Sequence, residues 1–315
     1  MTTAHLGTPR RFSLLVNPIA GRGAGRRAAG VVERRLRTAG AEVDVLPADS
    51  LDRMREWAAD AVSDAQASRA QGRFHAVVAV GGDGTVHTVL QGVGETGVPF
   101  GVVASGSGDD AARAWGLPRA RPQLAADILL TGSPSPVDLG VAADATGRRT
   151  WFATVVAAGF DARVSERALT LTAVPSAIRY LVAIASELRQ FRPLSYRLTL
   201  DGETTQVEGM LVAVANSPSY GGGMAVCPDA DPTDGLLDVL VLAPVPTAEF
   251  LQVFPRVYRG SHMSHPAVSV RRARRVLVED ADVVTFVDGE RLGPLPQHLT
   301  VVPGGLSVIG AADER

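Results

Sequence analysis

Residues 76–85 read AVVAVGGDGT, a uniformly apolar run followed by Gly81-Gly82-Asp83-Gly84-Thr85. Such a run is typical of a strand covered on both faces, and the residues from about Thr85 predict a helix. Glycines at a strand-to-helix turn let backbone N–H groups approach a phosphate closely. Asp83 would repel a bare phosphate, but it suits Mg²⁺ held beside one. The alternative is a tight connection in which Asp83 caps the helix.

Two other turns follow apolar runs in the same way. Residues 17–25, NPIAGRGAG, come after a strand predicted over 12–16 and before a helix predicted over 24–37. Residues 105–110, SGSGDD, come after a strand predicted over 100–103, and Asp109 or Asp110 is expected to cap the next helix. A further strand over 43–46 and a helix from near Asp49 complete the alternation, which predicts a parallel α/β sheet with these turns at its carboxyl edge. For residues 17–25 a flexible connection is the alternative.

The character of the sequence changes after Ser133-Pro134-Ser135-Pro136. Strands are predicted beyond it over 137–141, 151–156, 196–200, 210–215, 236–242, 276–279, 283–287 and 299–302, with helices over 176–191 and 247–258. The alternation of polar and apolar residues within two of these runs is typical of antiparallel sheets. We therefore predict an α/β domain over 1–136, to which residues 304–315 return as a last strand, and a mainly antiparallel β domain over 137–303.

Composition excludes several classes of function. The 315 residues carry a formal charge of −2, which gives no global case for binding nucleic acid. The chain has 31 basic residues besides histidine, and all of them are arginine. Mechanisms that need a lysine are therefore excluded. The one cysteine allows no disulfide within the chain. No run is apolar for the length that a signal peptide or a membrane span needs, which predicts a cytoplasmic protein.

Three motifs in the second half have both a structural and a functional interpretation. Asp-Gly-Glu occurs at 201–203 and at 288–290, each a hairpin signal, and pattern alone does not separate the two. The stretch 220–235 carries Asp229, Asp231 and Asp234, which suit a hard cation or a solvated turn. The predicted helix over 176–191 fits either a core helix or a lipid groove.

These turns, in this order, resemble the catalytic domain of the diacylglycerol kinase family, which includes soluble bacterial lipid kinases and the sphingosine and ceramide kinases. The resemblance covers nearly the whole chain, through Asp138-Leu139-Gly140, Gly159-Phe160-Asp161-Ala162 and the stretch 221–238 to Asp288-Gly289-Glu290. It implies a NAD-kinase-like and diacylglycerol-kinase-like α/β domain that binds ATP. It also implies a β-rich domain, with the lipid entering between the two.

The resemblance also implies roles for individual residues. Positions matching the family's ATP contacts are Asn17, Pro18, Gly21, Gly81, Gly82, Gly84, Thr85 and Ser107. Asp83, Asp138 and Glu290 match the acidic network around a catalytic Mg²⁺, and either Asp288 or Glu290 would take the proton of the lipid hydroxyl, with Glu290 favoured. Asp234 matches a ligand of a second, structural Mg²⁺, completed by carbonyls near Asp231 and Leu236.

We therefore expect an ATP-dependent lipid kinase of phospholipid metabolism that transfers the γ-phosphoryl group to a diacylglycerol-like or sphingoid-like hydroxyl, in transient contact with a membrane. Edge strands of the second domain would permit a homodimer. One alternative is an NAD kinase, which shares the Gly81–Thr85 motif. Another is a pseudokinase that binds lipid or nucleotide, because Asp109 stands where the family usually has asparagine and Pro47, Thr154 and Ala157 also depart from its pattern.

Overall fold

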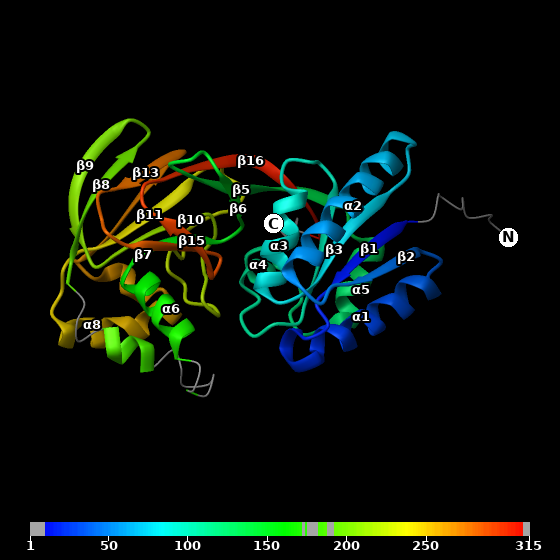
Figure 1. Ribbon diagram of the computed structural model, residues 1–315, viewed down its shortest axis with the longest axis horizontal. Coiled ribbons are helices and arrows are strands. Elements are labelled where there is room, and N and C mark those ends of the chain that lie inside the picture. The colour runs from blue at the N-terminus through cyan, green and yellow to red at the C-terminus, as the bar shows by residue number, and fades with distance from the viewer. Residues whose placement is uncertain (1–9, 172–173, 175–181, 188–191, 311–315) are drawn as a thin grey trace. The chain divides into compact units, whose positions relative to one another are not determined.

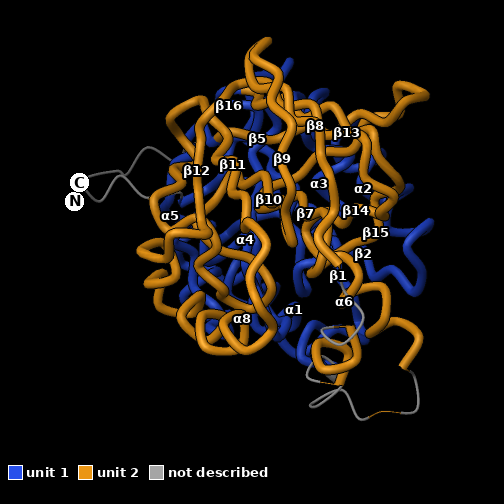
Figure 2. The backbone as a smooth tube through the Cα atoms, turned by 90° about the vertical axis from the view of Figure 1, so that its left-hand side faces the viewer, with its two compact units in different colours: residues 1–137, 303–315 blue, residues 138–302 orange. Residues whose placement is uncertain are grey.

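The computed structural model describes residues 10–171, 174, 182–187 and 192–310, which divide into two compact units. Unit 1 comprises residues 1–137 and 303–315, and unit 2 comprises residues 138–302 (Figure 2). Two strands, β5 (Pro134–Asp144) and β16 (Gln297–Ile309), belong partly to each unit. The units are described separately below.

Unit 1 is an alternating α/β unit around a parallel sheet (Figure 1). Its strands run in the order β2-β1-β3-β4, and the end of β16 pairs in parallel with β4 at Ser307 and Val308. The elements before β5 are β1 (Arg11–Val16), α1 (Ala20–Thr38), β2 (Glu42–Pro47), α2 (Leu51–Ala70), β3 (His75–Gly81), α3 (Asp83–Val93), β4 (Pro99–Ala104), α4 (Asp110–Ala114) and α5 (Pro122–Thr131).

Helices cover both faces of this sheet, which explains why the amino-acid sequences of its strands are rich in apolar residues. Helix α1 packs against α5 and α2 packs against α3, and each pair also contacts the strands. Every residue of β3 is buried, as its uninterrupted apolar run predicts. Phe12, Leu14, Val78 and Val80 belong to the core on the side of α1 and α5, together with Val32 and Leu36 of α1.

Unit 2 is built from antiparallel strands. A six-stranded sheet runs β12-β11-β10-β7-β14-β15, and a second group pairs β16, β13, β8 and β9. Its elements after β5 are β6 (Arg149–Phe152), β7 (Val155–Gly159), α6 (Phe160–Thr170), β8 (Leu194–Leu200), β9 (Glu203–Gly209), β10 (Leu211–Ala215), β11 (Leu237–Leu242), α8 (Thr247–Val253), η1 (Phe254–Arg259), η2 (Ser261–Ser264), β12 (Val268–Ala273), β13 (Arg275–Glu279), β14 (Val284–Val287) and β15 (Glu290–Pro294).

Apolar side chains of the two groups of strands share one core, so unit 2 is a sandwich. Tyr196 of β8 and Val276 of β13 belong to the same cluster as Val156 of β7, Val212 of β10 and Phe286 of β14. The predicted fold class, a parallel α/β part and an antiparallel β part, is confirmed.

Several local predictions differ from the structure. The run 151–156 is not one strand but two, β6 and β7, separated at Ala153 and Thr154. Helix α6 was not predicted, and neither was β9, whose residues are mostly exposed and polar because it lies at a sheet edge. The helix predicted over 176–191 lies largely outside the described residues, although 182–187 are helical. The predicted helix over 247–258 is α8 followed by the 3₁₀ helix η1.

Candidate functional site

The three predicted turns of unit 1 meet at the carboxyl edge of neighbouring strands β1, β3 and β4. The Asn17 side-chain amide donates to Thr85 Oγ1 at 3.3 Å, which links the first turn to the second. A Cβ on Gly106 would lie 2.6 Å from the Gly82 Cα, and one on Gly21 would lie 2.5 Å from the Ser105 carbonyl oxygen. The glycines at these positions thus allow the three turns to pack backbone against backbone.

The first turn is shorter than the sequence suggests. Helix α1 begins at Ala20, not at residue 24, because the Asn17 Oδ1 accepts hydrogen bonds from the backbone N–H groups of Ile19 and Ala20, both at 3.2 Å. Gly21 therefore falls in the first turn of the helix with a φ of +55°. Asn17 and Pro18 remain half-buried at the strand end.

Asp83 joins the second turn to the third. It is the first residue of α3, and its carboxylate accepts a hydrogen bond of 2.6 Å from the Asp110 backbone N–H, at the start of α4. Asp83 therefore does not cap its own helix, since the N-cap residue is Gly82, without a side-chain bond. Burial, together with the neighbouring carboxylate of Asp110, raises the pKa of Asp83. A cation bound beside Asp83 would offset the free-energy cost of burying the ionised carboxylate.

The third turn contains a buried carboxyl group and a buried hydroxyl group. Asp109 is left-handed, with a φ of 52°, and its carboxylate accepts from the Gly106 N–H at 2.8 Å. Asp109 is the N-cap residue of α4, as predicted, but its side chain does not cap the helix, and Asp83 supplies the acceptor for the Asp110 N–H. Burial raises the pKa of Asp109. The Ser105 hydroxyl is buried without a hydrogen-bond partner among the described residues, and Ser107 is exposed.

In unit 2, Asp138 and the turn 231–235 form one hydrogen-bonded assembly. The Asp138 carboxylate accepts from the Gly235 N–H at 2.6 Å, and its own N–H donates to the Pro232 carbonyl at 2.7 Å. Asp234 pairs with Arg272 of β12, and its other carboxylate oxygen accepts from the Leu236 N–H at 3.0 Å. Asp231 accepts from the Thr233 N–H and hydroxyl, so each of these three carboxylates already has a hydrogen-bond donor.

Asp288 and Glu290 occupy the hairpin between β14 and β15. The Asp288 carboxylate accepts three hydrogen bonds, from the N–H groups of Ala153 and Thr154 at 3.0 and 2.8 Å and from the Thr154 hydroxyl at 2.6 Å. Glu290 begins β15 and is exposed. No group of three or more His, Cys, Asp or Glu side chains gathers as a metal cluster within the described part of the chain.

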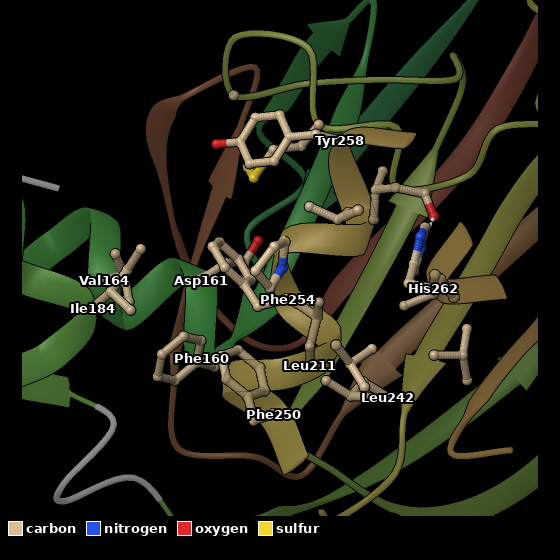
Figure 3. Close-up of a pocket in the computed structure, with 18 of the residues that line it drawn as sticks. Phe160, Asp161, Val164, Ile184, Leu211, Leu242, Phe250, Phe254, Tyr258 and His262 are labelled. Carbon is tan, nitrogen blue, oxygen red and sulfur yellow. Dashed lines mark hydrogen bonds between the residues drawn. The ribbon is translucent and has the colours of Figure 1, made fainter. Parts of the chain in front are cut away.

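Sequence reasoning did not identify an apolar pocket in unit 2, with a volume of about 460 Å³. Side chains from α6, from α8 and η1, and from β10 and β11 converge on it (Figure 3). Phe160, Phe250 and Phe254 form a continuous aromatic wall, with ring centroids 4.9 and 5.6 Å apart. The motif Gly159-Phe160-Asp161-Ala162 was the available signal, because Phe160 and Asp161 both line the pocket.

One carboxyl group faces this apolar space. Asp161 accepts a short hydrogen bond from the Tyr220 hydroxyl, and burial raises the pKa of Asp161 to about 6. Tyr220 pairs with Met224 across Gly221, Gly222 and Gly223, which all have positive φ. The triple-glycine stretch therefore forms a tight loop that brings both Tyr220 and Met224 to the pocket wall.

Two protein-family models together match nearly the whole chain. Residues 11–142 match the model described as the diacylglycerol kinase catalytic domain, and residues 154–310 match the YegS C-terminal NAD kinase beta sandwich-like domain. A protein of Mycobacterium tuberculosis named diacylglycerol kinase is 37% identical over 301 residues, which are 95% of this chain and 94% of that protein. A Bacillus subtilis protein of the same name is 29% identical over 91% of this chain and 92% of its own length.

A solved structure has the same fold. The crystal structure of a putative diacylglycerol kinase from Bacillus anthracis matches with a TM-score of 0.76 over 98% of both chains, at 20% sequence identity.

Proposed function

This chain belongs to the diacylglycerol kinase family, and from that premise we propose that it transfers the γ-phosphoryl group of ATP to the free hydroxyl of diacylglycerol. Membership makes it an ATP-dependent lipid kinase, a phosphotransferase of lipid metabolism. Diacylglycerol is the acceptor named for its relatives. The proposed product is a phosphatidate, a precursor in phospholipid biosynthesis.

The observation that carries the choice of a lipid over NAD as the acceptor is the apolar pocket of unit 2. Its lining is mostly aliphatic and aromatic; the polar residues are the hydrogen-bonded pair Asp161 and Tyr220, together with Ser165, Tyr258, His262 and His265. A pocket of this composition suits an acyl chain, which gains free energy in proportion to the apolar area it buries. NAD is polar and would leave this surface unused, so the pocket favours a lipid over NAD as the acceptor.

We propose that ATP binds at the carboxyl edge of the unit 1 sheet. The three turns that meet there bring together backbone N–H groups and the buried Ser105 hydroxyl, which has no partner among the described residues. Because the chain contains no lysine, backbone donors, arginine and a metal ion must neutralise the phosphates. The matching residues are Asn17, Pro18, Gly21, Gly81, Gly82, Gly84, Thr85 and Ser107.

Asp83 fits a catalytic Mg²⁺. Its carboxylate is partly buried beside Asp110 and accepts from the backbone N–H groups of Asp110 and Ala111, and burial raises its pKa. Mg²⁺ held there would neutralise charge that develops on the transferred group. A second Mg²⁺ at the turn 231–235 would have to compete with Arg272, which already pairs with Asp234, the side-chain ligand that the resemblance implies there.

In unit 2 we propose that Glu290 is the general base and that Asp288 and Asp138 are positioning residues. Glu290 would accept the proton of the lipid hydroxyl as its oxygen bonds to the γ-phosphorus and the bond to the ADP oxygen breaks. Asp288 is less suited to this role because three donors already occupy its carboxylate. Asp138 would hold the turn 231–235 in place through Gly235.

The experiment that tests the function follows γ-labelled phosphate from ATP into lipid. The purified chain is incubated with Mg²⁺ and mixed micelles of diacylglycerol, with sphingosine micelles and NAD as parallel acceptors. We expect organic-phase label with diacylglycerol, and a kcat at least about 100-fold lower for Asp83→Asn. Asp60→Asn, an exposed change on α2, is the matched control and should behave as wild type.

Three results would each contradict part of the proposal. Phosphorylation of NAD or sphingosine without phosphatidate would refute the acceptor. Equal kcat for wild type and Asp83→Asn would remove Asp83 from the mechanism, and no turnover with any acceptor would favour a pseudokinase.

We also propose that the protein acts from the cytoplasm at the membrane surface. No helix among the described residues is long and apolar enough to cross a membrane. Because a diacylglycerol acceptor resides in a bilayer, we propose that the chain reaches it from the bilayer surface. The edge strands β9 and β12 would permit pairing between copies.

A further inference from the structure

Beside the apolar pocket lies a segment whose exposed surface combines apolar and cationic side chains. Helix α8 and the 3₁₀ helix η1 form residues 247–259, which we call the α8–η1 segment. Its inner side chains, Phe250, Val253, Phe254 and Val257, line the pocket. The segment therefore has one side in the lipid pocket and another side open to solvent.

The open side exposes large apolar groups. Leu251 is 53% exposed and Tyr258 is 56% exposed, although Tyr258 also lines the pocket and so stands at its mouth (Figure 3). Leu251, Pro255 and Tyr258 are spaced by four and three residues, which places them on one face of a helical segment, and Pro255, which is exposed, lines the pocket as Tyr258 does. Exposed leucine and tyrosine at a pocket mouth are costly in water, and tyrosine is favoured where an apolar phase meets water.

Positive charge lies beside this apolar face, on the exposed side of the segment. Arg256 and Arg259 flank Tyr258 in the sequence, and both are exposed. The one acidic residue of the segment, Glu249, is paired with His265 at 3.0 Å. Apolar and cationic groups interleaved in this way complement an anionic bilayer, in which the former enter the interface and the latter meet phosphate headgroups.

We propose that the α8–η1 segment docks on the surface of a bilayer containing anionic phospholipid, and that the lipid acceptor passes beside Tyr258 into the pocket. This inference rests on the proposed function. Beyond that function, it identifies which face of unit 2 contacts the membrane and predicts that this face prefers anionic lipid.

The test measures binding of the full chain to sedimenting vesicles of phosphatidylcholine alone and of phosphatidylcholine with phosphatidylglycerol. We expect wild type to prefer the anionic vesicles. Arg256→Ser with Arg259→Ser should weaken that binding by about 30-fold, since each charge near the surface contributes about 1 kcal/mol. Leu251→Ser should weaken binding to both vesicle types. Arg53→Ser with Arg55→Ser and Leu51→Ser, exposed changes on α2, are the matched controls.

A second measurement separates this inference from the function on which it rests. Turnover of a short-chain diacylglycerol presented as dissolved monomer should stay within about twofold of wild type in the Arg256/Arg259 and Leu251 variants, because none of these side chains lines the pocket. Loss of turnover on vesicles with retention on monomer would support docking.

Each contrary outcome has one meaning. Wild type that phosphorylates monomeric diacylglycerol but shows no preference for anionic vesicles would overturn the docking surface and leave the function standing. Vesicle binding with the expected charge dependence but no phosphorylation would overturn the function and leave the docking surface standing. Equal losses in the α2 controls would also overturn the proposal, as would no binding to either vesicle, which would leave the surface to a protein partner.

Discussion

The two Asp-Gly-Glu hairpins of unit 2 share one local structure. Asp201 and Asp288 are both left-handed, with φ of 49° and 48°, and each is followed by a glycine of positive φ. Each aspartate donates its N–H to a carbonyl at the start of a neighbouring strand, at 3.0 Å, and its carboxylate accepts from two consecutive N–H groups there. In both hairpins the aspartate therefore hydrogen-bonds the hairpin to a third strand, an arrangement that we call the aspartate clamp.

The hairpins differ in their surroundings. The donors to Asp288 are Ala153 and Thr154, which are buried, and the Thr154 hydroxyl adds a third hydrogen bond. The donors to Asp201 are the exposed Arg274 and Arg275. Each glutamate begins the second strand of its hairpin, and Glu203 pairs with Arg271. The shared motif therefore encodes the turn and the clamp, whereas any catalytic role depends on the surroundings.

The largest difference is expected at the two glutamates. Glu290→Gln should lower kcat for diacylglycerol about 10²- to 10⁴-fold, because the amide cannot accept the hydroxyl proton. Glu203→Gln should leave kcat within about twofold of wild type. The measurement is kcat at saturating ATP and lipid for both variants, and equal kcat values would assign the base to another residue.

The next difference is expected at the two aspartates. Asp288→Ala should lower the free energy of unfolding by about 2–3 kcal/mol, because buried donors lose a charged acceptor. Asp201→Ala should cost about 1 kcal/mol or less, since water can reach its donors. Urea unfolding of each variant measures this. Asp288→Asn keeps one acceptor oxygen and should recover part of the stability, and similar losses in both alanine variants would contradict the contrast.

The hairpins also show which features of the structure can be predicted from the sequence. Asp-Gly predicts both turns because the left-handed backbone is local chemistry, and the apolar run before Gly81 predicts β3 for a similar reason. The partner of each carboxylate was not predictable. Asp83 bonds to the N–H of Asp110, 27 residues away, and Asp288 bonds to Thr154, 134 residues away. Such contacts depend on strand order, which periodicity does not specify.

The apolar pocket was missed for the same reason. Phe160, Phe250 and Phe254 lie close to one another in space, but Phe160 is some ninety residues from the other two in the chain. Neither run carries a signal that the two pack together. The motif Gly159-Phe160-Asp161-Ala162 supplies two residues of one wall, but only the fold shows that they line a pocket together with Phe250 and Phe254.

A smaller effect is expected in the pH dependence of the stability that Asp201 provides. The N–H groups of Arg274 and Arg275 lower the pKa of Asp201 below its ordinary value of 3.8. The stabilisation from this shift is therefore present above about pH 4 and is lost as the pH falls through the lowered pKa. Unfolding free energies of wild type and Asp201→Asn should differ at pH 7 and converge at lower pH. A difference that grows on acidification would contradict the assignment.

The smallest effect is expected at the ion pair of the exposed hairpin. Glu203 and Arg271 lie 2.9 Å apart, but their side chains are 79% and 50% exposed. Water and salt screen such a pair, and holding two long side chains together costs entropy, so the coupling should be about 0.5 kcal/mol or less. A double-mutant cycle with Glu203→Gln and Arg271→Gln measures it. A coupling above about 1 kcal/mol would contradict this screening and would narrow the energetic contrast between this hairpin and the one that carries Glu290.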